Sequence, residues 1–170
     1  MKKVLLIIAS NGFQQIEYNK PKEILEKAGF EVVTASDKSG QVVAKDGSTT
    51  QVDFTLEEVV VDDYNGIFLI GGPGAIDHLD NNKTYVILQQ AREKDKLYGA
   101  ICISPRILAK AGVLENKKAT GWDGDKKLEE ILSQHNAFHS AEGVVVDGNL
   151  ITASGPDAAE QFGQAISKLL

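Results

Sequence analysis

The chain is organised around a strand-to-helix turn, Ala100-Ile101-Cys102-Ile103-Ser104-Pro105. The apolar residues that lead into this turn predict a short buried strand. Ser104 is a favourable helix N-cap, and Pro105 suits the first helical position because its missing N–H would have no partner there. Cys102, the only cysteine, therefore precedes a helix N-terminus, where unpaired N–H groups favour a thiolate. The turn predicts a thiol pKa below the ~8.5 of a free cysteine.

Small residues flank this cysteine two positions away on either side, namely Ala100 and Ser104. The same spacing of small residues occurs in a nucleophile elbow, where bulk would block a tight turn. A lone cysteine is also a common small core residue. The turn by itself therefore leaves catalysis and core packing as alternatives.

Composition limits the classes of function. We expect residues 1–170 to form a single domain, because the chain is too short for two comfortable ones. The net charge is −6 and the lysines are scattered, which disfavours nucleic-acid and membrane partners. No run approaches the ~20 apolar residues of a membrane helix. One cysteine cannot form an internal disulfide, which fits a soluble, cytoplasmic protein.

Uninterrupted apolar runs at residues 4–9, 30–35 and 66–70 predict strands that are covered on both faces, as in parallel sheets. Helical patterns separate these runs. The alternation predicts a flavodoxin-like, doubly wound α/β fold with a mostly parallel sheet and helices on both faces. Ligands bind at the carboxyl edge of such sheets, so the loops at residues 10–15 and 71–74 are candidate site walls.

The remaining elements complete this pattern. Pro21 interrupts the predicted helix 15–27 and implies a kink or a late start that would leave residues 16–18 irregular. Lys45-Asp46-Gly47 predicts the turn of a peripheral hairpin. A second hairpin is expected around Asp147-Gly148. The other expected elements are helices 83–94, 105–111, 126–134 and 156–170 and a short strand at 118–121.

A glycine-rich loop, Gly71-Gly72-Pro73-Gly74, follows the strand at residues 66–70. Such loops let backbone N–H groups approach a ligand closely. The loop does not match a dinucleotide fingerprint, because Asp77 stands at the third glycine position and the strand is not the first. We therefore expect no nucleotide cofactor.

Glu17 stands in an otherwise uncharged stretch beyond the first strand. If it is buried beside the sulfur of Cys102, desolvation raises its pKa and allows a protonated carboxyl to donate to a thiolate. The alternative is an exposed glutamate at a helix start.

Other titratable groups are weaker candidates. His135 and His139 have a metal-ligand spacing, but a helix end falls between them, so a surface loop is favoured. His78 follows the glycine-rich loop and is interpreted as a solvated residue. Four acids, Asp123, Asp125, Glu129 and Glu130, suit a solvated helix start. The sequence therefore predicts no metal site.

With these motifs in place, the chain resembles the DJ-1/PfpI (ThiJ) superfamily, which has the class I glutamine amidotransferase-like fold, over nearly its whole length. The motifs that carry the resemblance occur in the superfamily's order. They are strand 4–9 followed by Glu17, residues 22–29 with 31–36, Gly71-Gly72-Pro73-Gly74, Ala100-Ile101-Cys102, residues 111–114 and residues 151–156.

The resemblance implies a role for each site residue. Cys102 would be the elbow nucleophile and Glu17 its protonated partner. Gly71, Gly72 and Ile103 would form the backbone oxyanion pocket. Pro73 and Trp122 would be pocket walls. The resemblance also implies a homodimer or larger homo-oligomer, without a cofactor.

Two departures from the superfamily pattern bear on function. Peptidase-like members carry a histidine directly after the cysteine, where this chain has Ile103, and DJ-1-like members supply a histidine where Trp122 stands. Without a Cys–His pair, peptide hydrolysis is the weakest hypothesis. The first hypothesis is an enzyme of the glyoxalase III or deglycase type that acts on small reactive carbonyls or glycated adducts. The alternative is a redox sensor or stress-response chaperone in which Cys102 is oxidised.

Overall fold

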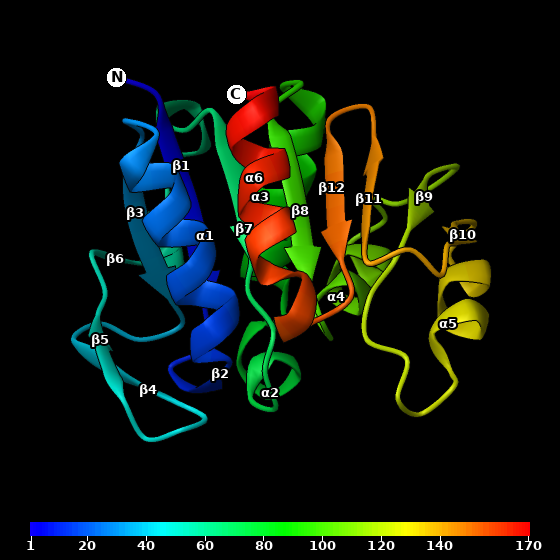
Figure 1. Cartoon of the computed structure of the whole chain (residues 1–170), viewed down its shortest axis with the longest axis horizontal. Helices are drawn as coiled ribbons and strands as arrows, with labels where there is room; N and C mark the ends of the chain where they lie inside the picture. The colour runs from blue at the N-terminus through cyan, green and yellow to red at the C-terminus, as the bar shows by residue number, and fades with distance from the viewer.

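The computed structural model describes residues 1–170 and is built on one seven-stranded sheet (Figure 1). Its strands, in spatial order, are β11 (Val144–Asp147), β12 (Leu150–Ala153), β8 (Leu97–Ile101), β7 (Gly66–Leu69), β1 (Lys3–Ile8), β3 (Glu31–Ser36) and β6 (Phe54–Thr55). All neighbouring pairs are parallel except β11 with β12. The prediction of a mostly parallel sheet is confirmed.

Helices cover both faces of this sheet, as predicted. Helices α1 (Gln15–Lys27) and α6 (Ala159–Leu169) lie on the front face in Figure 1, and α3 (Asn82–Glu93) and α4 (Pro105–Lys110) lie behind it. The continuous apolar run of β1 is buried from both sides, since Leu5, Leu6 and Ile7, which point alternately to the two faces, are all fully inaccessible. This double burial explains why the strand shows no alternation of polar and apolar residues.

Smaller elements surround the carboxyl edge and the far side of the sheet. They are a three-stranded sheet of β2 (Asn11–Phe13), β4 (Gln41–Ala44) and β5 (Thr49–Gln51), a pair formed by β9 (Lys118–Ala119) and β10 (Phe138–His139), the helices α2 (Ala75–Leu79) and α5 (Leu128–Gln134), and three 3₁₀ turns, η1 (Leu56–Glu58), η2 (Val61–Asp63) and η3 (Pro156–Ala158). The pattern-based prediction misses β2, β6, β10 and α2, which are all five residues or shorter.

Two local expectations are wrong. Pro21 neither kinks out residues 16–18 nor delays α1, which begins at Gln15 and contains the proline. Ser104 occupies the N-cap of α4, but its hydroxyl donates to the carbonyl of Ile70 (2.8 Å) and does not cap the helix. The expected hairpin around residues 147–148 is present, and its strand β12 pairs with β8 inside the main sheet.

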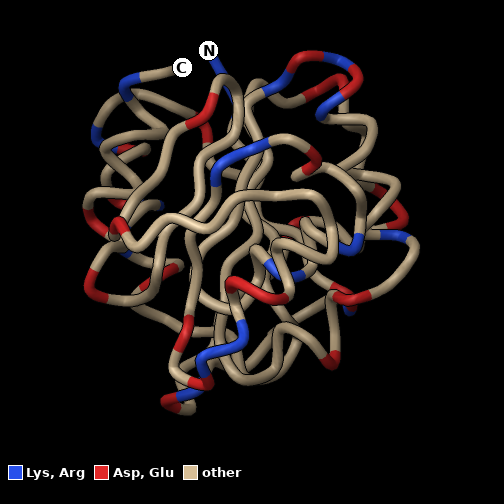
Figure 2. Tube along the Cα trace, turned by 90° about the vertical axis from the view of Figure 1, so that its right-hand side faces the viewer, with Lys and Arg blue, Asp and Glu red and all other residues tan.

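Charged residues of both signs are interspersed over the surface (Figure 2). None of the helices is both long and apolar enough to cross a membrane.

Candidate active site

Three neighbouring strands of the sheet, β8, β7 and β1, deliver the candidate site residues to one edge. Cys102 follows β8, Gly71 and Gly72 follow β7, and Glu17 lies in the first turn of α1 after β1. These are the carboxyl ends of the strands, at the lower end of the sheet in Figure 1. The structure therefore brings the predicted residues together.

Cys102 adopts the backbone conformation of an elbow. Its φ of +64° lies in the left-handed region, which non-glycine residues rarely occupy and which costs roughly 1–2 kcal/mol. Hydrogen bonds hold the strained residue on both sides, since its N–H donates to the carbonyl of Ala153 (2.9 Å) and its own carbonyl accepts from Trp122 N–H (2.6 Å). Such strain is maintained only where the surrounding structure enforces it.

Gly71 allows the thiol and the carboxyl to meet. A Cβ at Gly71 would lie 2.6 Å from the Cβ of Cys102 and 2.7 Å from Oε2 of Glu17. Gly72 adopts a φ of +119°, and a Cβ there would lie 2.5 Å from both Gln14 N and Gly12 O. Side chains are thus sterically excluded from both positions.

Glu17 is fully buried, which rules out the exposed helix-start alternative. Its Oε2 accepts a hydrogen bond from Gly71 N–H (2.9 Å). Its Oε1 has no hydrogen-bond partner, and the carboxyl lies beside Cys102, against the same face of Gly71. Burial raises the pKa of Glu17 to about 7, although the hydrogen bonds to Cys102 and Gly71 oppose the shift. The carboxyl can therefore gain or lose a proton near neutral pH.

The thiol is not activated in the way that the sequence predicts. Burial and then the adjacent Glu17 raise the pKa of Cys102 to about 12, although the backbone N–H groups of Ile103 and Gly72 act in the opposite direction. The prediction that the turn lowers the thiol pKa of Cys102 below the free value is therefore wrong, and Glu17 is the adjacent group that can accept the proton of the thiol.

Two backbone donors lie near the reactive sulfur. They are the N–H groups of Ile103 and Gly72, which act to lower the pKa of the Cys102 thiol. An oxygen that becomes negatively charged when the thiol attacks a carbonyl would lie near the same two donors. Gly71 does not take its expected part in the oxyanion pocket, because its N–H already donates to Glu17.

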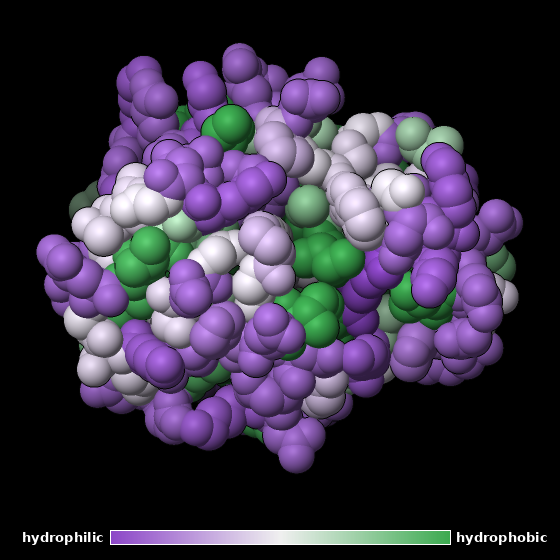
Figure 3. All heavy atoms as spheres, turned by 90° about the horizontal axis from the view of Figure 1, so that it is seen from below, coloured by the Kyte–Doolittle hydropathy of each residue, from purple (hydrophilic) through white to green (hydrophobic).

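A cavity of about 480 Å³ opens beside the sulfur. It is lined by Gln14, Lys45, Gly72, Pro73, Ile76, Cys102, Ile103, Trp122 and Pro156. The predicted wall residues Pro73 and Trp122 both lie here. Figure 3, which looks onto this edge, shows apolar side chains exposed between polar ones. No histidine lines the cavity, so Glu17 is the group available for proton transfer.

Arg106 holds the wall residue Trp122 in place. The guanidinium lies 5.4 Å from the centre of the indole ring and donates to the Trp122 carbonyl (3.1 Å). It also forms two hydrogen bonds with Asp125, at 2.9 and 2.7 Å, which lower the pKa of that carboxyl to about 2. Asp125, predicted as part of a solvated acidic face, therefore supports the wall of the cavity.

Four cavity residues are absent from the predicted site residues, namely Gln14, Lys45, Ile76 and Pro156. Lys45 lies in the turn of the hairpin that the sequence assigns to the periphery, and its N–H donates to the carbonyl of Phe13 (2.8 Å). Pairing of β4 with β2 places this turn beside the cavity. Gln14 falls in the loop 10–15, which is expected to wall the site, three residues before Glu17.

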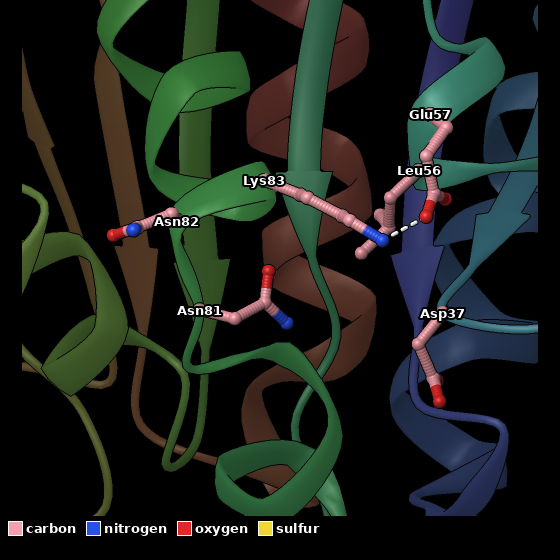
Figure 4. Close-up of a pocket in the computed structure, with 6 residues that line it drawn as sticks. All are labelled: Asp37, Leu56, Glu57, Asn81, Asn82 and Lys83. Carbon is pink, nitrogen blue, oxygen red and sulfur yellow. Dashed lines mark hydrogen bonds and ion pairs between the residues drawn. The ribbon is translucent and has the colours of Figure 1, made fainter.

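A second cavity, of about 440 Å³, lies away from the thiol (Figure 4). It is lined by Asp37, Leu56, Glu57, Asn81, Asn82 and Lys83. Its charged groups are already engaged: Lys83 pairs with Glu57, and Asp37 accepts hydrogen bonds from Ser10 (2.8 Å) and lies 3.0 Å from His78 Nδ1. His78, predicted to be solvated, is thus tied to Asp37 and does not line the thiol cavity.

The histidines and acids nearer the C-terminus form no second site. His135 is the C-cap of α5, and His139 lies in β10. Asp123 accepts a hydrogen bond from Leu128 N–H (3.0 Å) at the start of α5. No three His, Cys, Asp or Glu side chains are grouped so that they could hold a metal ion.

The fold and the site define a class of protein: an α/β domain with a cysteine at a strained elbow, a buried carboxyl beside it and glycine loops around both. The chain belongs to the DJ-1/PfpI family, whose model matches residues 2–169.

Relatives and solved structures agree with this assignment. An uncharacterized protein of Methanocaldococcus jannaschii is 38% identical over 169 residues, which cover 99% of this chain and 82% of that protein. A ThiJ/PfpI domain protein from Brachyspira murdochii superposes with a TM-score of 0.92 at 28% identity, over 98% of this chain and 95% of the other. DJ-1beta of Drosophila melanogaster gives 0.89 at 29% identity, over 100% and 91%.

Proposed function

We propose that this protein is an enzyme that acts on small reactive carbonyl compounds or glycated adducts, of the glyoxalase III or deglycase type. The observation that carries the proposal is the convergence of the Cys102 thiol, the buried Glu17 carboxyl and the N–H groups of Gly72 and Ile103 beside one cavity.

The first chemical step follows from this arrangement. Ionised Glu17 accepts the proton of the Cys102 thiol while the sulfur bonds to the carbonyl carbon of the substrate. The π electron pair of the carbonyl moves to its oxygen, which the two N–H groups stabilise. Glu17 then returns the proton to this oxygen. The product is a hemithioacetal, and Glu17 is ready for the next proton transfer.

Turnover assays test this proposal. Methylglyoxal, glyoxal and a glycated amino acid are incubated with the wild type and with Cys102→Ala and Glu17→Gln, and loss of the carbonyl compound is followed. We expect turnover by the wild type, none by Cys102→Ala, and a decrease of about 10²–10⁴-fold in Glu17→Gln, as for loss of a general base. The proposal would be overturned if the wild type turns over none of the three compounds.

A redox sensor or stress-response chaperone is the second candidate, and the donors around the sulfur favour it. Oxidation of Cys102 to a sulfinate consumes two equivalents of hydrogen peroxide, each reduced to water. The sulfinate oxygens would accept hydrogen bonds from Gly72, Ile103 and protonated Glu17. A sensor would gain two oxygen atoms by mass at low peroxide without turning over any carbonyl compound.

Peptide hydrolysis remains the weakest candidate. The leaving amine needs an acid, and no histidine lines the cavity to serve as one. A cytoplasmic location is part of the proposal, because the free thiol of Cys102 is best maintained in a reducing compartment.

A further inference from the structure

Lys45 is the one charged side chain among those that line the cavity at Cys102. It lies in the turn between β4 and β5, and a backbone hydrogen bond to Phe13 (2.8 Å) fixes this turn against β2, which precedes α1. The fold therefore fixes the backbone of Lys45 beside the cavity, and its side chain is exposed.

The charge of Lys45 is not neutralised within the chain. Its ammonium forms none of the nine ion pairs, whereas lysines such as Lys94 and Lys110 do. The neighbouring carboxylate, Asp46, is bound instead by the backbone N–H of Ser48 (3.0 Å) and by its hydroxyl. Lys45 is thus a free cation at the mouth of the cavity.

The other polar side chains of the cavity also offer donors. The carbonyl oxygen of Gln14 accepts from Ile16 N–H (3.2 Å), which leaves its amide NH₂ group for a ligand. The indole of Trp122 can only donate. Apart from the reacting pair itself, the cavity thus presents hydrogen-bond donors and one positive charge. Such a lining complements an oxygen-rich anion.

We propose that the carbonyl compounds this site takes carry a carboxylate or phosphate group, and that Lys45 pairs with this anion while Cys102 attacks the carbonyl carbon. The inference rests on the proposed function for the nature of the substrate. Lys45 then determines specificity, and a neutral aldehyde of the same size is the poorer substrate.

Two alkylating reagents of similar size test the role of Lys45 without requiring turnover. Iodoacetate is an anion and iodoacetamide is neutral, and each reacts by forming a bond from Sγ to its methylene carbon with departure of iodide. Because the chain has one cysteine, all alkylation reports on Cys102. The measured quantity is the ratio of the iodoacetate rate to the iodoacetamide rate at low ionic strength.

Three variants accompany the wild type: Lys45→Met, Lys45→Arg and Lys168→Met. Lys168 is an exposed lysine near the end of α6, at the opposite end of the sheet from Cys102, and its change removes the same net charge. We expect the ratio to fall about two- to fivefold in Lys45→Met and to hold in the other two, as for a partly solvated ion pair. Both rates are measured well above pH 7, so that Glu17 is ionised in every variant and repels iodoacetate equally in each.

An unchanged ratio in Lys45→Met, or an equal fall in Lys168→Met, would overturn the inference. A fall specific to Lys45 supports it even if the turnover assays fail, so the two proposals are tested separately. Protection of Cys102 from iodoacetamide then distinguishes the anions. Glyoxylate is compared with glyoxal, and glyceraldehyde 3-phosphate with glyceraldehyde. The inference would also be overturned if neither anion protects Cys102 better than its neutral counterpart does.

Discussion

Glu17 is a buried carboxyl whose ionisation opposes folding. Its pKa is about 7 in the folded protein, against 4.5 for an unperturbed glutamate, so the folded state binds the extra proton between these values. Stability therefore falls as the pH rises through this window. The shift corresponds to about 3 kcal/mol above pH 7.

Replacement of Glu17 by Gln should remove this penalty. We expect Glu17→Gln to become more stable relative to the wild type as the pH rises. The difference between their free energies of unfolding should grow by up to about 3 kcal/mol from about pH 5 to about pH 8. Urea unfolding at the two pH values measures the difference. An equal difference at both pH values would mean that the pKa of Glu17 is not raised in the folded protein.

Gly71 is the residue on which the contact between the thiol and the carboxyl depends. Gly71→Ala should destabilise the protein by about 1–3 kcal/mol, because its Cβ would lie 2.6 Å from the Cβ of Cys102. Gly143→Ala is the matched control, since its nearest neighbour would lie at an ordinary 3.9 Å. Equal stability of the two variants in urea unfolding would contradict this steric account.

Cys102, Glu17 and the glycine loop could be predicted as one site because each follows a strand that is recognisable from its apolar run. The thiol pKa could not, because it depends on burial and on the Glu17 contact, which are properties of the packed state. Lys45 was missed for a related reason. Its turn is visible in the sequence, but pairing of β4 with β2 is a long-range contact that no local pattern encodes.

At the scale of elements, the crossing of α1 and α6 positions the helix that carries Glu17. Gly163 of α6 faces Pro21 of α1, and a Cβ on Gly163 would lie 2.8 Å from the Pro21 Cα. The proline that appears to interrupt α1 in the sequence therefore lies at a close helix contact. The local sequence around Pro21 does not reveal this contact, because α6 is distant in sequence.

Gly163→Ala tests this crossing, because two effects of opposite sign compete. Helix propensity favours alanine by roughly 0.5–1 kcal/mol, whereas overpacking costs about 1–3 kcal/mol. We expect a net loss of stability on urea unfolding, and a slower alkylation of Cys102 if α1 shifts. A gain in stability of the size expected from helix propensity alone would show that α1 and α6 can move apart without a packing cost.

At the scale of the whole molecule, the mostly parallel sheet and the helices on both of its faces were predictable because apolar runs alternate with helical patterns along the chain. The short elements were not, because two- to five-residue segments such as β6 and α2 have no periodicity to detect.

Association of the molecule is a further prediction. The resemblance to the DJ-1/PfpI superfamily implies a homodimer or larger assembly, and apolar side chains such as Ile16 and Phe54 are 43% and 42% exposed. We expect sedimentation at micromolar concentration to show a dimer or larger species. A monomer alone over this range would contradict the prediction.

The central claim is that Cys102 reacts by giving its proton to Glu17, and the pH dependence of Cys102 alkylation by iodoacetamide tests it most directly. In the wild type, the rate should rise as Glu17 ionises, with an inflection near its pKa of about 7. In Glu17→Gln, this inflection should disappear, and the rate should increase only as the thiol itself ionises at higher pH. An inflection near pH 7 that persists in Glu17→Gln, or a wild-type rate that shows no inflection near pH 7, would contradict the account.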